Sequence, residues 1–402
     1  MAMSDKTAAV SGQLRAELVI VGGGIMGLWA ALKADRRGID TILIDGAGIA
    51  SGASGGLLGA LMAHMPDRWN EKKQLQFEGL LTLEAEIAAV EAESGLSTGY
   101  RRCGRLIPLP KPHLRPLAER HSDEAQTNWD QSGRRFDWSV TDESPFTDWP
   151  SRQFSEAGIV LDSFAGRVSP RGLMASIRQL LARSRHVRVI EGQAVRSIDA
   201  AARSVALEDG SAIGFGDLLV AAGVGSFPLL EMVGPELGKS LGRGVKGQAA
   251  LLKADLPDDL PLLYLDGLYV VPHEGGHVAI GSTSENRYDD PFSTDAQLDA
   301  LIAEARELAP VLREAEVVER WAGLRPKAID RDPMVGPHPE HPHVHALTGG
   351  FKVSFGIAHL LADAVLDSIA GKRLALPHSF SLAHHVSVAA RRADDEEIAE
   401  IP

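Results

Sequence analysis

The stretch that decides the fold is residues 16–27, AELVIVGGGIMG, in which a short apolar run ends at three consecutive glycines. The apolar run Ala16–Val21 predicts a buried strand, and Ile25–Ala34 after the glycines predicts a helix. A second apolar run, Thr41–Ile44, predicts another buried strand, which is followed directly by Asp45. Strand, glycine-rich turn, helix and strand in this order predict a βαβ unit at the start of the chain.

Within this unit, the spacing Gly22-x-Gly24-x-x-Gly27 is typical of a turn that binds the pyrophosphate of a dinucleotide. Gly22 permits the tight turn, Gly24 lets a phosphate approach the backbone, and Gly27 lets the helix pack closely on the strand. Phosphates then lie at the helix N-terminus, where free N–H groups and the helix dipole favour negative charge. Asp45 is placed to accept hydrogen bonds from ribose hydroxyls. The alternative, a glycine-rich turn without a ligand, does not explain this register.

The segment after the second strand, Ile49–Ala60, consists mainly of glycine, alanine, serine and leucine. The glycine pattern alone does not separate NAD from FAD. A backbone with such small side chains can run against a second extended phosphate or a flat ring, which favours FAD. The alternative for this segment is a flexible loop.

Length and composition exclude several classes of protein. The 402 residues exceed the ~150 residues of one average domain, and 44% hydrophobic with 24% charged residues is the balance of a globular protein. The net charge of −13 disfavours a nucleic-acid partner. The single cysteine suits a reducing compartment. We find no secretion signal in residues 1–14 and no membrane span, so we expect a cytoplasmic protein.

Further along the chain, Asp67–Glu93 predicts a long amphipathic helix, and residues 100–150 predict short strands and loops of a second domain. Ser169 and Pro170 predict the start of another helix. Pro257–Thr283 predicts antiparallel strands, and Ile357–Ile369 predicts a last helix.

The expected fold class is mixed α/β, with an interrupted Rossmann-like FAD-binding domain and an antiparallel, β-rich substrate-binding domain. We assign 15–95, 160–238 and 327–375 to the first domain and 96–159 and 239–326 to the second, with tails at 1–14 and 376–402.

Several short motifs occur in the order found in one family. They are VIVGGGIMG at 19–27, ASGASGGLLGA at 50–60, LVAAGVGS at 219–226, YVVP at 269–272, IGST at 280–283, WAGLRP at 321–326 and TGGF at 348–351. With these motifs, residues 16–371 resemble the FAD-dependent D-amino-acid oxidase superfamily, most closely its glycine oxidase and sarcosine oxidase branch.

The resemblance implies a set of cofactor-binding residues around non-covalently held FAD. It places the glycine turn and Asp45 at the ADP moiety, the serine- and glycine-rich segment along the flavin ring, and the N-terminus of the last helix at the flavin pyrimidine edge. The implied residues are Gly22, Gly24, Ile25, Met26, Gly27, Asp45, Ser51, Ser54, Gly55, Gly56, Leu57, Val195, Ala222, Gly223, Arg325, Gly350, Phe351, Lys352, Val353 and Ser354.

The resemblance also implies three residues at the substrate. Arg325 matches the arginine that holds the substrate carboxylate, since a guanidinium pairs with a carboxylate through two parallel hydrogen bonds. Tyr269 matches a tyrosine that hydrogen-bonds the same carboxylate, and Lys352 stands where glycine oxidases tend to have an arginine. The alternatives are an ordinary salt bridge for Arg325 and a core tyrosine for Tyr269.

Two departures from the family pattern affect the expected chemistry. Ala279 stands where sarcosine oxidases have a lysine that activates oxygen, which puts fast use of oxygen in doubt. Ala322 and Gly323 stand where sarcosine oxidases have the cysteine that bonds covalently to the flavin, so we expect non-covalent FAD.

The implied activity is oxidation of a small amino acid or N-substituted glycine, such as glycine, sarcosine or iminodiacetate. Hydride would pass from Cα to flavin N5, the imine would hydrolyse to an oxo acid such as glyoxylate, and O2 would be reduced to H2O2. The alternatives are an amino-acid dehydrogenase that passes electrons to a quinone or partner subunit, and a non-catalytic FAD-binding subunit. A homo-oligomer is compatible with either enzyme.

Three other features carry less specific signals. The histidines at 338, 341, 343 and 345 could bind a metal, but the prolines between them favour a surface turn between two strands. Cys103 is expected to be a small buried residue rather than a redox group. Trp129, Trp138 and Trp149 are expected to pack in the structure rather than form a lid.

Overall fold

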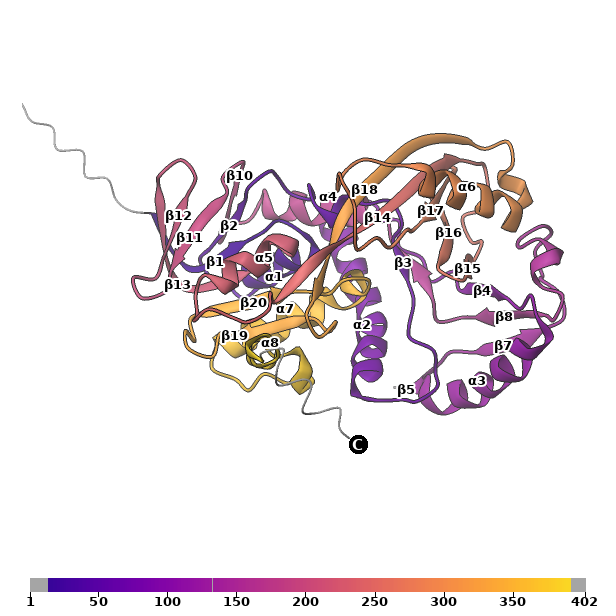
Figure 1. Ribbon diagram of the computed structural model, residues 1–402, viewed down its shortest axis with the longest axis horizontal. Coiled ribbons are helices and arrows are strands. Elements are labelled where there is room, and N and C mark those ends of the chain that lie inside the picture. The colour runs from indigo at the N-terminus through magenta and orange to yellow at the C-terminus, as the bar shows by residue number, and fades with distance from the viewer. Residues whose placement is uncertain (1–13, 132, 392–402) are drawn as a thin grey trace, which may run out of the picture.

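Two eight-stranded sheets organise the computed structural model, which describes residues 14–131 and 133–391 (Figure 1). The first thirteen residues and the charged segment from residue 392 onward, for which the sequence predicted tails, lie outside the described residues. Parallel and antiparallel pairings both occur, which confirms the predicted mixed α/β class. No helix in the described ranges is both long and apolar enough to cross a bilayer.

The first sheet has the order β10-β2-β1-β13-β12-β11, with β20 paired to β13 and β19 paired to β20. Its β10, β2, β1, β13 and β20 pair in parallel, whereas β11, β12 and β19 pair antiparallel. The bounds are β1 Leu14–Val21, β2 Thr41–Asp45, β10 Val187–Glu191, β11 Val195–Asp199, β12 Ser204–Leu207, β13 Ala212–Val220, β19 Met334–Pro337 and β20 Val344–Thr348.

The parallel register brings distant loops together at one edge of this sheet. Val21 is paired with Ile44 on one side and with Val220 on the other. The carboxyl ends of β1, β2 and β13 therefore meet, and ligands of open α/β sheets bind at such an edge. The predicted βαβ unit is confirmed, with β1 beginning two residues earlier than expected.

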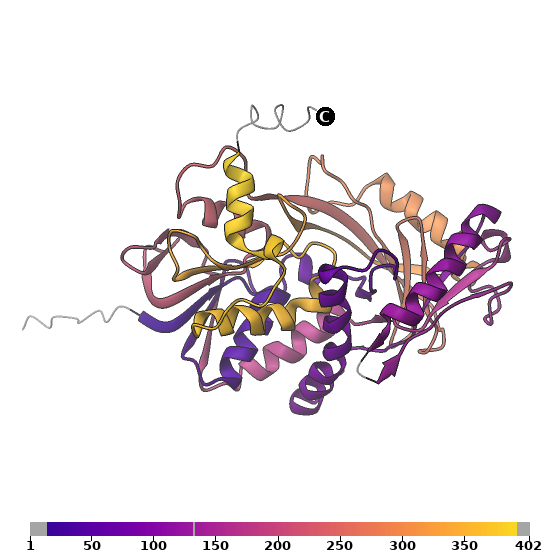
Figure 2. The same ribbon diagram turned by 90° about the horizontal axis from the view of Figure 1, so that it is seen from below.

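Three helices cover one face of the first sheet: α1 Ile25–Arg36, α4 Pro170–Leu181 and α7 Ser354–Ile369. A fourth, α2 Glu71–Ser94, packs on these helices and shares their core. Helix α1 packs between α4 and α7, and α2 contacts both α4 and α7 (Figure 2). The first turn of α2 is stabilised by Asn70, whose side chain accepts hydrogen bonds from the amides of Lys72 and Lys73. The helix ends at Gly95, whose positive φ of 72° is the left-handed conformation that favours glycine.

The second sheet has the order β18-β14-β17-β16-β15-β4-β8-β7 and is antiparallel except between β15 and β4. Its strands β14 and β18 are the longest in the described part of the chain and pair over almost their whole length. The bounds are β4 Arg105–Pro108, β7 Trp138–Thr141, β8 Ile159–Asp162, β14 Gly242–Lys253, β15 Leu262–Leu265, β16 Leu268–His273, β17 His277–Gly281 and β18 Glu316–Ala328.

Several helices of the structure were not predicted from the sequence. Helix α3 (Arg115–Asn128) lies in the segment predicted as strands and loops, and α6 (Ala296–Leu308) covers the second sheet. Helix α8 (Leu382–Ala390) lies in the predicted tail 376–402, yet Leu382 and Ala389 are fully buried against the first sheet. The remaining elements are α5 Ser226–Glu231, β3 Ala60–Leu61, β9 Gly166–Arg167, β5 Asp130–Gln131 and β6 Arg134–Arg135.

Candidate functional site

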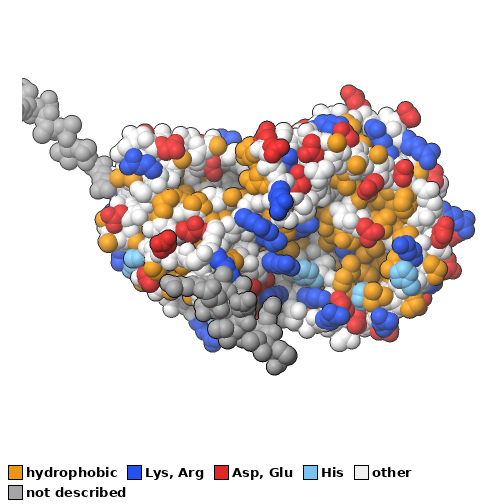
Figure 3. Space-filling model, in the orientation of Figure 1, with side chains coloured by type: hydrophobic (Ala, Val, Ile, Leu, Met, Phe, Trp, Pro, Cys, Tyr) orange, Lys and Arg blue, Asp and Glu red, His pale blue; other side chains and the backbone are white. Residues whose placement is uncertain are grey.

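A cavity of about 890 Å³ extends from the carboxyl edge of the first sheet to one face of the second sheet. Its walls come from the loops after β1, β2 and β13, from the segment 51–65, from strands of the second sheet, and from the start of α7. Lysine and arginine side chains gather in the hollow between the two parts of the molecule (Figure 3). The cavity is large enough for an extended cofactor and a small substrate.

At the nucleotide end the cavity wall is backbone, and added side-chain atoms would not fit. A Cβ on Gly27 would lie 1.9 Å from the carbonyl oxygen of Gly22, so this glycine permits the close approach of α1 to β1. Gly22 has a φ of +113°. These two glycines therefore play the structural roles predicted for the first and third positions of the motif.

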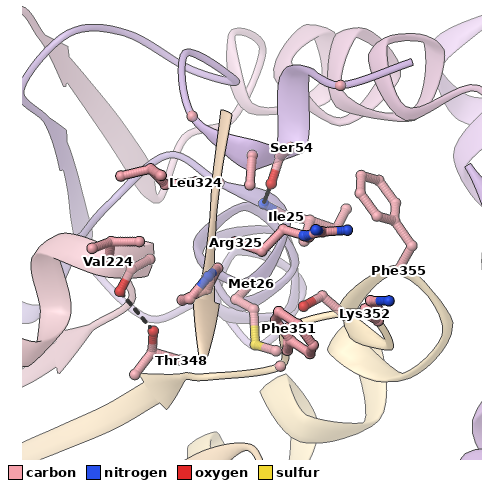
Figure 4. A pocket seen from close by; sticks show the side chains of 18 of the residues that line it. Ile25, Met26, Ser54, Val224, Leu324, Arg325, Thr348, Phe351, Lys352 and Phe355 are labelled. Atoms are coloured by element: carbon pink, nitrogen blue, oxygen red, sulfur yellow. Dashed lines mark hydrogen bonds between the residues drawn. The ribbon is translucent and has the colours of Figure 1, made fainter. Parts of the chain in front are cut away.

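The N-terminus of α1 is open toward the cavity except for one hydroxyl. The Ser54 Oγ accepts a hydrogen bond of 2.9 Å from the amide of Ile25, and it lies 3.3 Å from the position of a Cβ on Gly24 (Figure 4). The Ser54 hydroxyl thus lies at the helix N-terminus, where it can donate its own proton to a phosphate oxygen. The expected position of Ser54 beside the flavin ring stays a prediction.

The Asp45 carboxylate is held by three backbone amides. One oxygen accepts from Gly23 at 2.6 Å, and the other accepts from Ala47 at 3.0 Å and Gly48 at 2.7 Å. These bonds fix the carboxylate at the loop edge of the cavity, where the oxygen bonded to Gly23 keeps a lone pair for a ribose hydroxyl.

Most predicted site residues line the cavity. Gly27 and Gly55 are the two that do not, because each is packed against backbone: a Cβ on Gly55 would lie 2.2 Å from the carbonyl oxygen of Ala50. The predicted residues that line it are Gly22, Gly24, Ile25, Met26, Asp45, Ser51, Ser54, Gly56, Leu57, Val195, Ala222, Gly223, Tyr269, Arg325, Gly350, Phe351, Lys352, Val353 and Ser354. Their individual roles toward a ligand stay predictions.

These features fit FAD. The cavity is long, its nucleotide end offers bare backbone and a helix N-terminus to phosphates, and Asp45 stands ready for a ribose. The loop after β13 and the end of β20 are joined by a hydrogen bond from Thr348 Oγ1 to the carbonyl of Gly223, which closes one wall (Figure 4).

At the other end, Arg325 on β18 lines the cavity. Its guanidinium donates to Ser282 Oγ at 2.9 Å, to the carbonyl of Thr283 at 2.6 Å and to the carbonyl of Lys246 at 3.2 Å, while its buried Nε has no partner. No carboxylate of the described residues lies within ion-pair distance of Arg325, which argues against an ordinary salt bridge. Burial lowers the pKa of Arg325, an effect that nearby Tyr269 and Glu285 oppose.

Three cations surround the ring of Phe351, at the turn before α7. Arg325, Lys327 and Lys352 lie 5.4, 5.8 and 5.7 Å from its centroid. Burial and the charges of Arg325 and Lys327 lower the pKa of Lys352. The side chains of Arg325 and Lys352 end on the same side of the cavity, next to Phe355 (Figure 4). The positive charge gathered here favours an anionic ligand group.

Tyr269 on β16 lines the cavity beside a second tyrosine that sequence analysis missed. The ring of Tyr264 on β15 lies 4.9 Å from that of Tyr269. Burial and Tyr264 raise the pKa of Tyr269, while the charges of Arg105 and Arg325 act against this. Tyr269 is therefore a neutral hydrogen-bond donor at neutral pH.

Sequence analysis also missed Arg105, Phe355 and Trp321 as cavity residues. The Trp321 ring lies 3.3 Å from the position of a Cβ on Gly56, and a Cβ on Gly323 would lie 2.5 Å from the same ring. The two glycines thus make room for one indole. A large aromatic residue next to the motif WAGLRP was the signal that could have indicated it.

The positions that depart from the family pattern are apolar and packed. Ala279 is fully buried in a small core with Leu57, and Ala322 is 7% exposed. The sole cysteine, Cys103, is partly exposed, and burial raises its pKa, so it does not have the character of a reactive thiolate.

Of the remaining sequence signals, the three tryptophans Trp129, Trp138 and Trp149 are buried, as expected. The four histidines lie around the turn between β19 and β20, but His338 and His345 are buried rather than on the surface. No group of three or more metal-ligating side chains occurs among the described residues.

Comparison with known proteins gives the family. Residues 17–364 match the family model DAO, described as FAD dependent oxidoreductase. The chain belongs to this family. It is 26% identical to the glycine oxidase of Geobacillus kaustophilus over 92% of this chain and 98% of that protein. It is 36% identical to the glycine oxidase of Pseudomonas aeruginosa, in a match that spans only 39% of this chain and 42% of that protein.

Solved structures of the DAO family show the same fold. The crystal structure of the Geobacillus kaustophilus glycine oxidase superposes with a TM-score of 0.81, at 23% identity, over 92% of this chain and 99% of the other. The iminodiacetate oxidase of Chelativorans sp. BNC1 superposes with a TM-score of 0.78, at 19% identity, over 90% and 98%. The predictions of an FAD-dependent oxidoreductase and of the glycine oxidase-like branch are confirmed.

Proposed function

We propose that this DAO-family protein oxidises a small amino acid or an N-substituted glycine, such as glycine, sarcosine or iminodiacetate. The products would be an oxo acid, which is glyoxylate for a glycine derivative, ammonia or the released amine, and H2O2 from O2. The observation that carries the proposal is the half-buried Arg325, which lines the cavity with no carboxylate of the described residues paired to it.

FAD, when bound non-covalently, supplies the hydride acceptor and transfers the electrons onward to oxygen. Gly22, Gly24 and the α1 N-terminus would hold its pyrophosphate, and Asp45 its ribose. The residues from Gly56 to Leu57 and from Gly350 to Ser354 would lie along its remaining length.

Arg325 would hold the substrate carboxylate by a charge-assisted hydrogen bond from the guanidinium N–H groups that its bonds within the protein leave free. Its bonds to Ser282 and Thr283 keep the guanidinium plane in one orientation, so the carboxylate directs Cα–H to one side of the cavity. Tyr269 would donate a further hydrogen bond to the same carboxylate. Lys352 adds positive charge to this end of the cavity, which suits a dicarboxylate such as iminodiacetate.

No carboxylate of the described residues lines the substrate end of the cavity, and hydride transfer does not need a side chain to remove a proton from Cα. The amine of the substrate must instead be unprotonated when it reacts, and its lone pair assists the departure of hydride. The apolar walls made by Leu57, Trp321 and Phe355 exclude water during this step.

Oxygen as the electron acceptor is part of the proposal. The buried methyl of Ala279 leaves no cation at that position, which favours slower reaction with oxygen than in sarcosine oxidases and supports a dehydrogenase as the second candidate. Retention of both Arg325 and Tyr269 in the cavity counts against a non-catalytic subunit.

The test is to screen the purified yellow protein for peroxide release with glycine, sarcosine, iminodiacetate and D-amino acids. We expect oxidation of at least one of them, and release of FAD into the supernatant on acid precipitation. Reduction of the flavin by substrate with fast reoxidation by a quinone analogue, but none by air within minutes, would establish the dehydrogenase instead. If none of the amines reduces the flavin, the proposed function is wrong.

A further inference from the structure

A second arginine lines the cavity on the same sheet as Arg325 but several strands away. Arg105 on β4 lines the cavity, and its side chain is only 2% exposed. In the sheet order, the strands that carry Tyr269 and Tyr264 lie between the strand of Arg325 and the strand of Arg105. The two arginines therefore stand at opposite ends of a wall whose middle is two tyrosines.

The Arg105 guanidinium is only partly satisfied within the protein. Its Nε and one terminal nitrogen donate to the same oxygen of Asp162, at 3.0 and 2.6 Å. The other terminal nitrogen contacts the thioether sulfur of Met62 at 3.3 Å. A thioether is a weak acceptor, so this nitrogen, with two N–H groups, has no strong partner among the described residues.

The Asp162 carboxylate has hydrogen-bond donors besides Arg105. Its second oxygen accepts from the amides of Phe164 at 2.8 Å and Ala165 at 3.1 Å. Asp162 is thus a rigid support that holds the guanidinium in place and leaves one edge free for a ligand.

The side chains at this end of the cavity carry more positive than negative charge, which favours a ligand with two anionic groups. Arg105, Arg325 and Lys352 line it, and Asp162 is the one carboxylate bonded to any of the three among the described residues. The acidic residue that lines the described cavity, Asp45, lies at the nucleotide end. Lys352 is more exposed than Arg105, so water screens the charge of Lys352 more than that of the buried Arg105.

We propose that Arg105 and Tyr264 form a subsite for a second, distal carboxylate of the substrate, while Arg325 and Tyr269 hold the first. The inference rests on the proposed function and narrows it to amines that carry two carboxylates. The Tyr264 hydroxyl has no hydrogen-bond partner among the described residues, and the Tyr264 ring lies 5.9 Å from the Arg105 guanidinium carbon. A carboxylate between them would receive N–H and O–H donors together.

Binding of non-reactive acids to the FAD-loaded enzyme tests the subsite without turnover. Glutarate has the shape of iminodiacetate with the amine replaced by CH2, and butyrate has the shape of sarcosine in the same way. Titrations followed by flavin absorbance should show glutarate binding at least about tenfold more tightly than butyrate, since charge-assisted bonds are lost with one carboxylate. A series from malonate to adipate identifies the spacing that fits best.

The double variant Arg105→Met/Asp162→Asn removes both charges together and so avoids a buried unpaired carboxylate. We expect glutarate affinity to fall about 10- to 100-fold and butyrate affinity to change less than about threefold. The exposed Arg134, outside the cavity, gives the control variant Arg134→Met, which should leave both affinities unchanged. If the double variant does not fold, Arg105→Lys is the test. We then expect a smaller loss of glutarate affinity and no change in butyrate affinity.

The subsite would be overturned if the Arg105 variants lost affinity equally for glutarate and butyrate, or if they kept the wild-type preference for glutarate. It would also be overturned if Lys352→Met lost this preference while the Arg105 variants kept it. Turnover of iminodiacetate and sarcosine separates this result from the proposed function. Selective glutarate binding without turnover of either amine would retain the subsite and reject the function. Turnover of sarcosine without any preference for dicarboxylates would do the reverse.

Discussion

At the nucleotide end of the cavity the wall is backbone, whereas at the substrate end it is long side chains. Gly22, Gly27 and Gly55 sit within van der Waals distance of other backbone atoms, and all three lie within one stretch of the chain. Arg325 and Tyr269 instead come from strands in another part of the sequence. The first arrangement tolerates no added atom, while the second can change its side chains without disturbing the fold.

This difference predicts that the cofactor is lost by small changes at one end and retained after large changes at the other. The same fold can then acquire a new substrate while it keeps FAD. Four experiments test the comparison.

The largest effect is expected for Gly27→Ala. The new Cβ would lie 1.9 Å from the Gly22 carbonyl oxygen, so α1 must move away from β1. We expect loss of stability by roughly 3 kcal/mol or more and more than tenfold loss of bound FAD. FAD per chain from the absorbance spectrum, together with urea unfolding, measures both. Gly238→Ala is the matched control, since Gly238 lies outside the cavity and its Cβ would meet nothing closer than 3.5 Å. Normal FAD content in Gly27→Ala would contradict the packing role.

The next largest effect is expected for Arg325→Ala. Losing one or two charge-assisted hydrogen bonds of about 1.5–3 kcal/mol lowers kcat/KM by at least roughly 10- to 150-fold. Arg325→Lys should recover only part, because an ammonium cannot hold the carboxylate plane. Both variants should retain FAD. Steady-state kinetics beside the flavin absorbance is the measurement, and near wild-type kcat/KM or loss of flavin would reject the assignment.

A smaller effect is expected for Lys352, whose pKa is lowered by burial and by Arg325 and Lys327. As pH rises, Lys352 loses its proton earlier than an ordinary lysine does, and attraction for anionic ligands weakens. Lys352→Met should weaken butyrate binding about three- to tenfold at neutral pH and remove this alkaline weakening. The Kd for butyrate as a function of pH checks it. Identical alkaline profiles in both proteins would show that another group is responsible.

The smallest effect concerns His359 on α7, at the nucleotide side. Burial lowers its pKa to about 4, so the folded protein binds fewer protons than the unfolded chain between that pH and the ordinary value of 6.5. The stability that this neutral histidine contributes is present above pH 6.5 and is lost as pH falls toward 4. Between pH 7 and pH 6 the loss should be about 0.7 kcal/mol.

In His359→Gln this part of the pH dependence should disappear, and the hydrogen bond between His359 and Thr82 can be replaced by the amide. Urea unfolding of both proteins at pH 7 and pH 6 measures the difference. A wild-type-like loss in the variant would assign the acid sensitivity to another buried group, such as His273, whose pKa burial also lowers to about 4.

The same difference explains how far the sequence could be interpreted. The nucleotide end could be predicted because its parts are consecutive: a strand, three glycines and a helix within residues 16–34. Tyr264 and Arg105 could not be predicted, because sheet pairing brings their strands together across more than 150 positions. The hydrogen bond of Ser54 could not be predicted for a similar reason, since its hydroxyl reaches the N-terminus of a helix 29 residues away.

Helices α3 and α8 were not predicted because their own sequences carry only weak signals for a helix. Helix α3 has few apolar residues and buries only Ala118, His121 and Ala125, so its amphipathic pattern is weak. Helix α8 begins after Ser381, which caps it, but it lies next to the charged end of the chain, whose composition dominated the prediction. In both cases tertiary packing, not local propensity, stabilises the helix.

The two long strands β14 and β18 have a mechanical consequence. Their pairing runs from Lys253 and Glu316 in the second sheet to Gly242 and Ala328, beside the core of the first sheet, and Lys327 forms a bridge to Gly350. A hinge motion that opened the cavity would have to bend this hydrogen-bonded ribbon. The ribbon therefore resists changes in the relative orientation of the two sheets. Substrate should therefore enter by movement of side chains and loops at the rim. The rigid ribbon also fixes the distance between the two ends of the cavity, and therefore the length of the ligand that the cavity accepts.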